Sequence, residues 1–207
     1  MKHTALTKWR RIIKCTLPKY ATYAHCYHGS QSKNTAVVTL VHLELAKWIS
    51  PACMNSADTS LSSHILALLY APPNLQSPLL LANVWMPHSG YEAATMRQAH
   101  ALVADLVLHW KGKGYVVLAA GYWNTTLTDS QRWGPPPLSE QPRVTDSAFQ
   151  SMLASTGMQI PVLCLGPTWE SNTNACQATL DHVLLTDCSL VSSFALVHDV
   201  TASDHQA

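Results

Sequence analysis

Residues 115–124 read YVVLAAGYWN. The first six, 115–120, form an uninterrupted apolar run of strand length, which is typical of a strand buried on both faces of a sheet. Polar groups follow at once in Gly121-Tyr122-Trp123-Asn124. Loops at the ends of buried strands are where α/β folds place the side chains that face a ligand. The stretch therefore predicts a central strand that leads directly into a functional loop.

A helix is predicted immediately before this strand, over residues 91–111. Its apolar positions recur at spacings of three and four, which places them on one face of a helix. Gly112 and Gly114 follow and are typical of a helix end. The predicted buried face consists of Met96, Ala99, Val103, Leu106 and Trp110.

Three apolar segments precede the helix, and each has the composition of a strand. The turn-like residues 71–74 (APPN) separate the last two, which predicts a hairpin of a buried sheet. The segments are residues 35–45 (TAVVTLVHLEL), 65–70 (ILALLY) and 78–86 (PLLLANVWM).

The second half of the chain continues this mixture of strands and few helices. A short helix is predicted over residues 145–155, and strands over 178–185 (ATLDHVLL) and 190–197 (LVSSFALV). Because hairpin-like returns outnumber βαβ units, we expect an α/β fold of the α+β sandwich type, with two packed mixed β-sheets flanked by helices.

The composition indicates one compact globular domain. Apolar residues make up 47% and charged residues 12% of the 207 residues, and the net charge is +1. This balance gives no global field for nucleic acid or a membrane, and no apolar run is long enough to span a bilayer. The six cysteines form no CxxC pair. We therefore expect reduced thiols in an intracellular protein, nuclear or cytoplasmic.

The start of the chain is basic, since the first acidic residue is Glu44 and seven Lys or Arg residues precede it. We divide the chain into a basic N-terminal segment, residues 1–33, and a domain over residues 34–207. Residues 8–14 (KWRRIIK) could form one or two amphipathic turns. A mitochondrial transit peptide, a nucleic-acid-binding arm and chance in a short window remain alternatives.

Four short segments combine polar groups with an apolar strand. They are residues 83–90 (NVWMPHSG), residues 121–124 (GYWN), Asp181 within its predicted strand, and residues 203–205 (SDH). In order and spacing they resemble the endonuclease/exonuclease/phosphatase superfamily of metal-dependent phosphodiesterases, whose strands end in NxYxP and GDxN and which carry a buried Asp and a terminal SDH. The resemblance covers residues 34–205 and is greatest to endonuclease domains of mobile elements such as retrotransposons.

The resemblance implies nucleic acid as the substrate class and Mg²⁺ or Mn²⁺ as the cofactor of an active member. It also implies that Asp181 pairs with His205, because a carboxylate fixes the proton state and orientation of an imidazole. Asp204 would face the metal, which prefers carboxylate and phosphate oxygens.

Three more residues receive roles from the resemblance. Asn124 would donate to the phosphate or position water. Trp85 stands where the family has a Tyr that contacts phosphate, and its indole N–H can donate but cannot accept a hydrogen bond. His88 could contact phosphate or lie in a solvated loop.

The sequence departs from the family at two places. Tyr122 stands where GDxN has its Asp, and a phenol with an ordinary pKa of about 10 cannot act as a carboxylate at neutral pH. The family's metal-ligand Glu has no counterpart, since nothing before Glu44 is acidic. We therefore expect a degenerate member that lacks the family's N-terminal elements and is weakly active or inactive.

Two other function classes remain open. One is a non-catalytic module that binds nucleic acid or protein, helped by a partner or fused domains outside this chain. The other is a phosphatase of inositol or sphingolipid headgroups. A serine hydrolase is disfavoured because no GxSxG is present, and zinc because no HxxxH is present. The cations that would support phosphate contacts are Lys8 to Lys19, Lys111, Lys113, Arg132 and Arg143.

Overall fold

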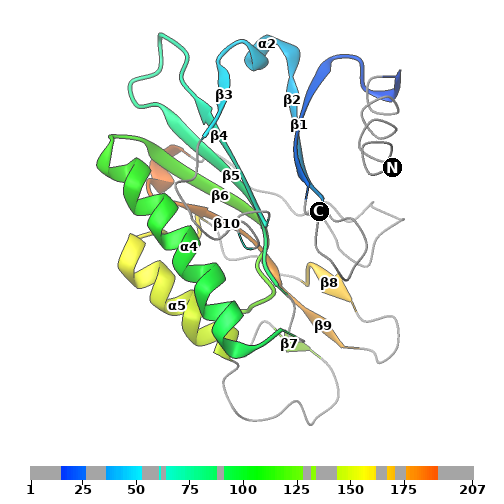
Figure 1. Ribbon diagram of the computed structural model, residues 1–207, viewed down its shortest axis with the longest axis vertical. Helices are drawn as coiled ribbons and strands as arrows, with labels where there is room; N and C mark the ends of the chain where they lie inside the picture. Colours follow the sequence, from blue (N-terminus) through cyan, green and yellow to red (C-terminus); the bar gives the residue numbers. More distant parts are fainter. Residues whose placement is uncertain are drawn as a thin grey trace.

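The computed structural model describes residues 15–26, 36–52, 61, 64–87, 91–127, 132–133, 144–161, 167–170 and 176–190. Its central element is a five-stranded sheet in the order β10-β6-β5-β4-β3 (Figure 1). Neighbouring strands are antiparallel except β5 and β6, which are parallel. The strands are β3 (Ile49–Pro51), β4 (Ile65–Tyr70), β5 (Leu79–Trp85), β6 (Val116–Tyr122) and β10 (Asp181–Leu185).

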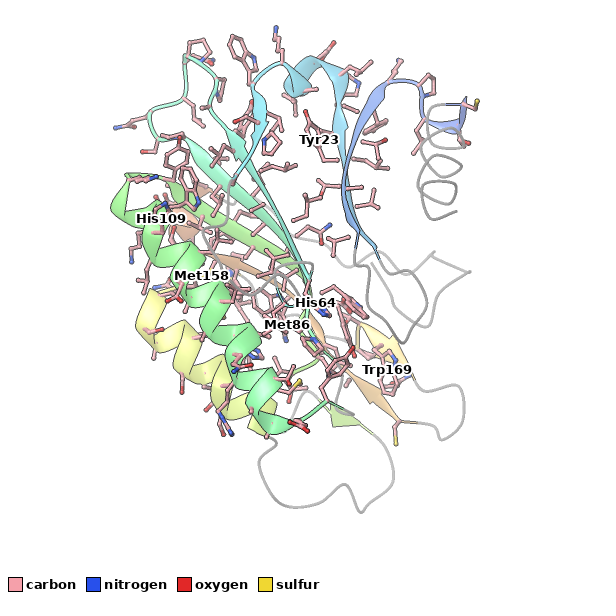
Figure 2. All side chains as sticks on the ribbon, in the orientation of Figure 1. Tyr23, His64, Met86, His109, Met158 and Trp169 are labelled. Atoms are coloured by element: carbon pink, nitrogen blue, oxygen red, sulfur yellow. The ribbon has the colours of Figure 1, made fainter. Side chains whose placement is uncertain are left out.

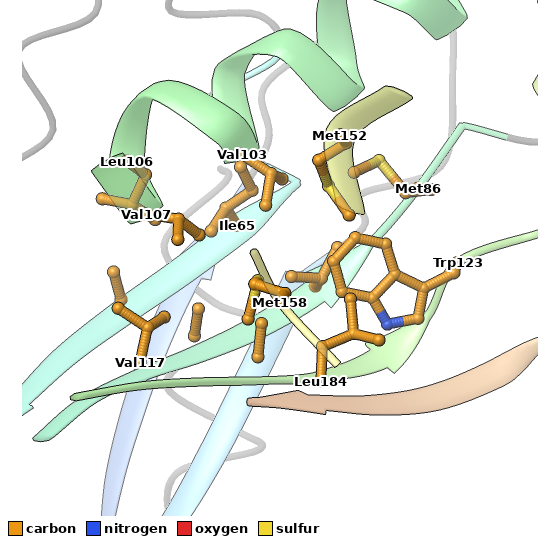
Figure 3. Packing of buried hydrophobic residues seen from close by; sticks show 14 of the residues in the cluster. Ile65, Met86, Val103, Leu106, Val107, Val117, Trp123, Met152, Met158 and Leu184 are labelled. Atoms are coloured by element: carbon orange, nitrogen blue, oxygen red, sulfur yellow. The ribbon is translucent and has the colours of Figure 1, made fainter. Parts of the chain in front are cut away.

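The parallel pair is joined by helix α4 (Ala93–Gly112), which crosses one face of the sheet next to α5 (Val144–Thr156) (Figure 1). All five residues predicted for the apolar face of α4 are buried. They pack with the helix-facing side chains of the sheet, and Trp123 and Phe149 lie fully buried in the same cluster (Figure 3). The predicted hairpin of β4 and β5 is also confirmed.

A second sheet covers the opposite face. It consists of β1 (Tyr20–Cys26) and β2 (Ala36–His42), paired antiparallel. Val37 and Val41 pack against Leu66 and Leu68 of the large sheet, and Tyr23 lies between the two sheets (Figure 2). The result is the predicted α/β sandwich, with two packed sheets and helices outside.

Two predicted strands have different limits in the structure, and a third lies almost entirely outside the described residues. The strand predicted over residues 35–45 ends at His42, because residues Leu43–Ala46 form the short helix α2 and the His42 side chain accepts the Glu44 N–H. The predicted strand 178–185 is divided into β9 (Gln177–Ala178) and β10, and the predicted strand 190–197 lies outside the described residues except Leu190, which is in a 3-10 turn. β9 lies between β7 (Arg132–Trp133) and β8 (Trp169–Glu170) in a third, small sheet.

Gly121 allows β6 to approach β5 closely. Its φ is +136°, a conformation that residues with a side chain rarely adopt, and a Cβ there would collide with the carbonyl oxygen of Val84. Val84 is its pairing partner in the parallel ladder. The end of β6 therefore requires glycine at this position.

The helix-facing side of β10 contains a buried imidazole. His182 stacks on Phe149 at 5.5 Å between ring centroids, and its Nε2–H donates to the Thr125 carbonyl at 2.9 Å. Burial lowers the pKa of His182, against the opposing effects of the Thr125 hydrogen bond and the Asp181 charge. Burial also lowers the pKa of His64. Both side chains are thus kept neutral to a lower pH than exposed histidines.

The glycine requirement predicts a large loss of stability for Gly121→Ala. We expect a decrease of about 3 kcal/mol or more in the free energy of unfolding, from backbone strain and overpacking together. Gly112→Ala is the matched control, because nothing lies within 4 Å of its Cβ position and its φ is not positive; it should be neutral or slightly stabilising. Urea unfolding followed by circular dichroism measures both, and equal midpoints would contradict the requirement.

The buried histidines predict a stability that falls in acid. An unfolded histidine binds a proton below about pH 6.5, whereas the lowered pKa values of His182 and His64 mean that the folded protein binds these protons only at a lower pH. The stabilisation that these histidines give to the folded state is therefore complete above pH 6.5. As the pH falls it is lost, and the free energy of unfolding decreases with a limiting slope of about 1.4 kcal/mol per pH unit for each histidine. Unfolding free energies measured from pH 8 to pH 5 should show a smaller slope in His182→Gln.

Candidate functional site

Three of the predicted site residues lie in one row across the large sheet. Trp85 ends β5 and Tyr122 ends β6, and these residues are partners in the parallel ladder. Asp181 begins the antiparallel strand β10 and is also paired with Tyr122. Paired residues point to the same face of a sheet. Their neighbours Val84 and His182 are buried toward the helices, so the row of Trp85, Tyr122 and Asp181 faces the other side.

His64 extends the row by one strand. It immediately precedes β4, and its imidazole stacks on the Trp85 indole with 4.9 Å between centroids and 6° between planes. Two hydrogen bonds of 2.8 Å join the same residues: Trp85 N–H donates to the His64 carbonyl, and His64 Nδ1–H donates to the Trp85 carbonyl. Trp85 also packs against the cluster between the two sheets. Its indole is therefore clamped in place as part of the sandwich.

Tyr122 and Asn124 are directly hydrogen-bonded. The Tyr122 hydroxyl donates to Asn124 Oδ1 at 2.8 Å, and Asn124 Nδ2 donates to the Pro87 carbonyl at 2.9 Å. Asn124 is 6% exposed and has a φ of +52°, which asparagine tolerates better than most residues. The chain Tyr122–Asn124–Pro87 thus connects the loop after β6 to the loop after β5.

The backbone around Asp181 is fixed from two sides. The buried Thr168 hydroxyl accepts the N–H groups of Leu180 and Asp181, each at 3.0 Å. Trp123 N–H donates to the Leu180 carbonyl at 2.8 Å, and Trp123 Nε1 donates to the His182 carbonyl at 3.0 Å. Asp181 is therefore presented on a rigid strand start.

Sequence reasoning missed two residues of this arrangement, His64 and Thr168. His64 stands directly before a predicted strand, whereas the sequence analysis singled out polar residues that come at the end of one. Thr168 is 12 residues from Leu180, and nothing in its local sequence indicates that its hydroxyl accepts two distant N–H groups.

The remaining predicted site residues lie outside the described part of the chain. These are His88, Asp204 and His205. The pairing of Asp181 with His205 and the metal contact of Asp204 thus remain predictions. Within the described ranges no three His, Cys, Asp or Glu side chains come together as a metal site. The row supplies one carboxylate, and by itself that donor set does not fit Mg²⁺, which takes several oxygen ligands.

Two predicted phosphate contacts are placed far from the row. Lys111 lies in the last turn of α4 and Lys113 follows it, so both are near the start of β6, at the other end of that strand from Tyr122. Figure 2 shows His109, in the same last turn, well away from His64 and Met86. Lys111 Nζ donates to the Thr156 carbonyl at 3.0 Å, and Lys113 lies over the Trp110 ring at 4.6 Å. Neither can reach a phosphate bound at the row. No helix among the described residues has the length and apolarity needed to cross a membrane.

Three solved structures with a similar fold are distant from the chain in sequence. The chain matches the endonuclease domain of TRAS1, a telomere-specific non-LTR retrotransposon, with a TM-score of 0.64 and 13% identity over 91% of this chain and 77% of that one. It matches the AP endonuclease LMAP from Leishmania major with a TM-score of 0.72 and 15% identity, over 91% of this chain and 68% of that one.

The 3′-5′ exonuclease NExo from Neisseria meningitidis gives a TM-score of 0.71 and 14% identity, over 94% of this chain and 80% of that one. At such identities these likenesses establish the shared fold alone. No curated protein matches the chain. The model of the endonuclease/exonuclease/phosphatase family, however, matches residues 5–205. This match spans nearly the whole chain, from before β1 to the SDH segment, and the chain belongs to the endonuclease/exonuclease/phosphatase family.

Proposed function

We propose that this chain is a nucleic-acid-binding member of its family in which phosphodiester hydrolysis is impaired at Tyr122. The observation that carries the proposal is the 2.8 Å hydrogen bond in which the Tyr122 hydroxyl donates to Asn124 Oδ1. A donor stands at the position where the sequence resemblance places a proton-accepting carboxylate.

Hydrolysis of a phosphodiester requires a water molecule that is oriented and relieved of a proton. Tyr122 keeps its own proton in the hydrogen bond to Asn124, so it does not take one from water. The same bond occupies Asn124 Oδ1, while the amide nitrogen holds Pro87. The two residues act as a structural link between loops. Asp181, the carboxylate that remains in the row, has the role of orienting His205 in the resemblance.

The residues that support the row are retained, which favours a site with impaired hydrolysis over a site that has been lost. Thr168 and Trp123 still hold the start of β10, and Gly121 still brings β6 against β5. Catalytic groups act well only when their supporting elements are rigid. Because this support is retained, a carboxylate placed at position 122 would be held by the same rigid elements.

The names of the solved relatives support nucleic acid as the ligand class, since they include two endonucleases and an exonuclease. The retrotransposon endonuclease domain among them supports the resemblance to endonucleases of mobile elements. Binding at the row would use neutral and aromatic side chains with one carboxylate, so we expect the phosphate contacts to come from cations elsewhere in the chain, other than Lys111 and Lys113.

Restoring a carboxylate at position 122 should restore turnover. We expect Tyr122→Asp to increase Mg²⁺-dependent nicking of supercoiled plasmid by about 10² or more, which is the scale of one general acid-base group. Tyr122→Phe, which keeps the ring and removes the hydroxyl, should stay as inactive as the wild type. Adding His205→Ala to Tyr122→Asp should abolish the gain. Equal nicking by the wild type and Tyr122→Asp would refute the assignment of impairment to this residue.

Binding without turnover should depend on salt. We expect the affinity for a DNA oligonucleotide to fall at least tenfold when the salt concentration is raised fourfold, as about two phosphate contacts imply. The double variant Lys111→Gln/Lys113→Gln should bind as the wild type does, because both lysines lie at the far end of α4. Fluorescence anisotropy at several salt concentrations measures this. Affinity that is independent of salt, or undetectable binding, would argue against a nucleic-acid-binding module.

A further inference from the structure

The row contains two half-buried aromatic residues on neighbouring strands. Trp85 and Tyr122 are partners in the parallel ladder of β5 and β6, so their side chains leave the same face of the large sheet. Neighbouring strands lie about 4.8 Å apart, and both side chains keep part of their surface open to solvent. The two rings therefore present an aromatic surface at this end of the sheet. We call Trp85 and Tyr122 the aromatic pair.

Both rings are held in place before any ligand arrives. The Tyr122 hydroxyl donates to Asn124 Oδ1 at 2.8 Å, and Asn124 in turn donates to the Pro87 carbonyl. Trp85 is stacked on the His64 imidazole with 6° between the ring planes. A ring that is already fixed loses little conformational entropy when a ligand stacks on it. The aromatic pair is therefore preorganised for stacking.

The charges of the row disfavour a phosphate as the group that meets this surface. Asp181 is paired with Tyr122 on the next strand, so the carboxylate of the row lies beside the aromatic pair and would repel an anion. Burial lowers the pKa of His64, so the imidazole that stacks on Trp85 is neutral at neutral pH and adds no positive charge. An uncharged, flat group therefore suits the aromatic pair better than a phosphate.

The nucleobase is the uncharged, flat part of a nucleic acid. In a duplex the faces of each base are covered by its neighbours in the stack, and the protein meets only base edges in the grooves. In a single strand the base faces can be exposed, and they stack on aromatic side chains of the protein. A surface made of aromatic rings therefore favours unpaired bases over paired ones.

We propose that the aromatic pair is a stacking site for an unpaired nucleobase, so that the chain binds single-stranded nucleic acid in preference to a duplex. The proposal rests on the proposed function, since it requires nucleic acid to be the ligand, but it does not depend on the impairment of hydrolysis. One stacked base contributes about a factor of ten to the affinity. The phosphates of the same strand are contacted by cations outside the row.

Fluorescence anisotropy with three ligands of equal length tests the stacking site on the full-length chain. The ligands are a labelled oligothymidylate, the duplex of that strand with its complement, and a strand of abasic units that has the same phosphates and no bases. EDTA is present so that the strands stay intact. At the same salt concentration, the wild type should bind the oligothymidylate about tenfold more tightly than either other ligand, because only this ligand offers an open base face.

Replacements in the aromatic pair separate stacking from packing. Trp85→Leu keeps an apolar side chain against the cluster between the two sheets and removes the ring, so the affinity for oligothymidylate should fall about tenfold. Tyr122→Leu should have a similar effect, whereas Trp85→Phe and Tyr122→Phe keep a ring and should keep most of the affinity. Trp48→Leu is the matched control and should bind as the wild type does. Trp48 is a 37% exposed tryptophan next to β3, at the other end of β4 from His64.

The outcomes distinguish the stacking site from the proposed function. Equal affinity for the single strand and the duplex, or for the oligothymidylate and the abasic strand, would overturn the stacking site and leave nucleic-acid binding in place. Equal effects of Trp85→Leu and Trp48→Leu would also overturn it. A chain that binds none of the three ligands would refute the proposed function and the stacking site together. The comparison of ligands uses the wild type alone, so it decides the question even if a variant fails to fold.

Discussion

The parallel pairing of β5 with β6 is the constraint on which the rest of the structure depends. It brings Gly121 against the Val84 carbonyl, at a distance and a φ that only glycine accommodates. It also requires a crossover helix, and α4 supplies it together with more of the buried core residues than α5 does. Because the two strands end side by side, Trp85 and Tyr122 become neighbours, and β10 adds Asp181 to the same row.

The end of this row carries a hydrogen-bond donor where the family resemblance places a carboxylate. A carboxylate after Gly121 would accept protons and hydrogen bonds, whereas the phenol of Tyr122 donates to Asn124, which in turn donates to Pro87. The polar groups are satisfied by one another, as buried polar groups must be. The arrangement therefore strengthens the connection between two loops at the position where the family resemblance expects a reactive group. In the proposed function, the same scaffold supports stability in place of turnover.

The two sheets differ in what covers them. The helices bury the outer side of the large sheet. On the other side, Asn83 Nδ2 donates to the Val38 carbonyl at 3.0 Å and to Thr39 Oγ1 at 3.2 Å, which fixes the sheet of β1 and β2 against the large sheet. That polar bridge sets the register between layers that are otherwise held by apolar contacts, which are not directional. The Val38 carbonyl is thus held by Asn83, while the Val38 side chain is 36% exposed.

The sequence by itself determined the elements whose pattern is local: the period of α4, the apolar strands β4, β5 and β6, and the loop residues that follow them, because periodicity and turn chemistry are properties of short windows. It also identified the family through four short segments. It could not separate β9 from β10 or end β2 at His42, since those limits depend on the Thr168 hydroxyl and on the His42 cap. Only the tertiary structure decided that His64 clamps Trp85, that Tyr122 donates to Asn124, and that Lys111 and Lys113 lie far from the row. The His64 clamp and the distance of the lysines depend on strand order and crossover, which no local pattern encodes. The bond between Tyr122 and Asn124 depends on the left-handed φ of Asn124 and on its hydrogen bond to Pro87 in another loop.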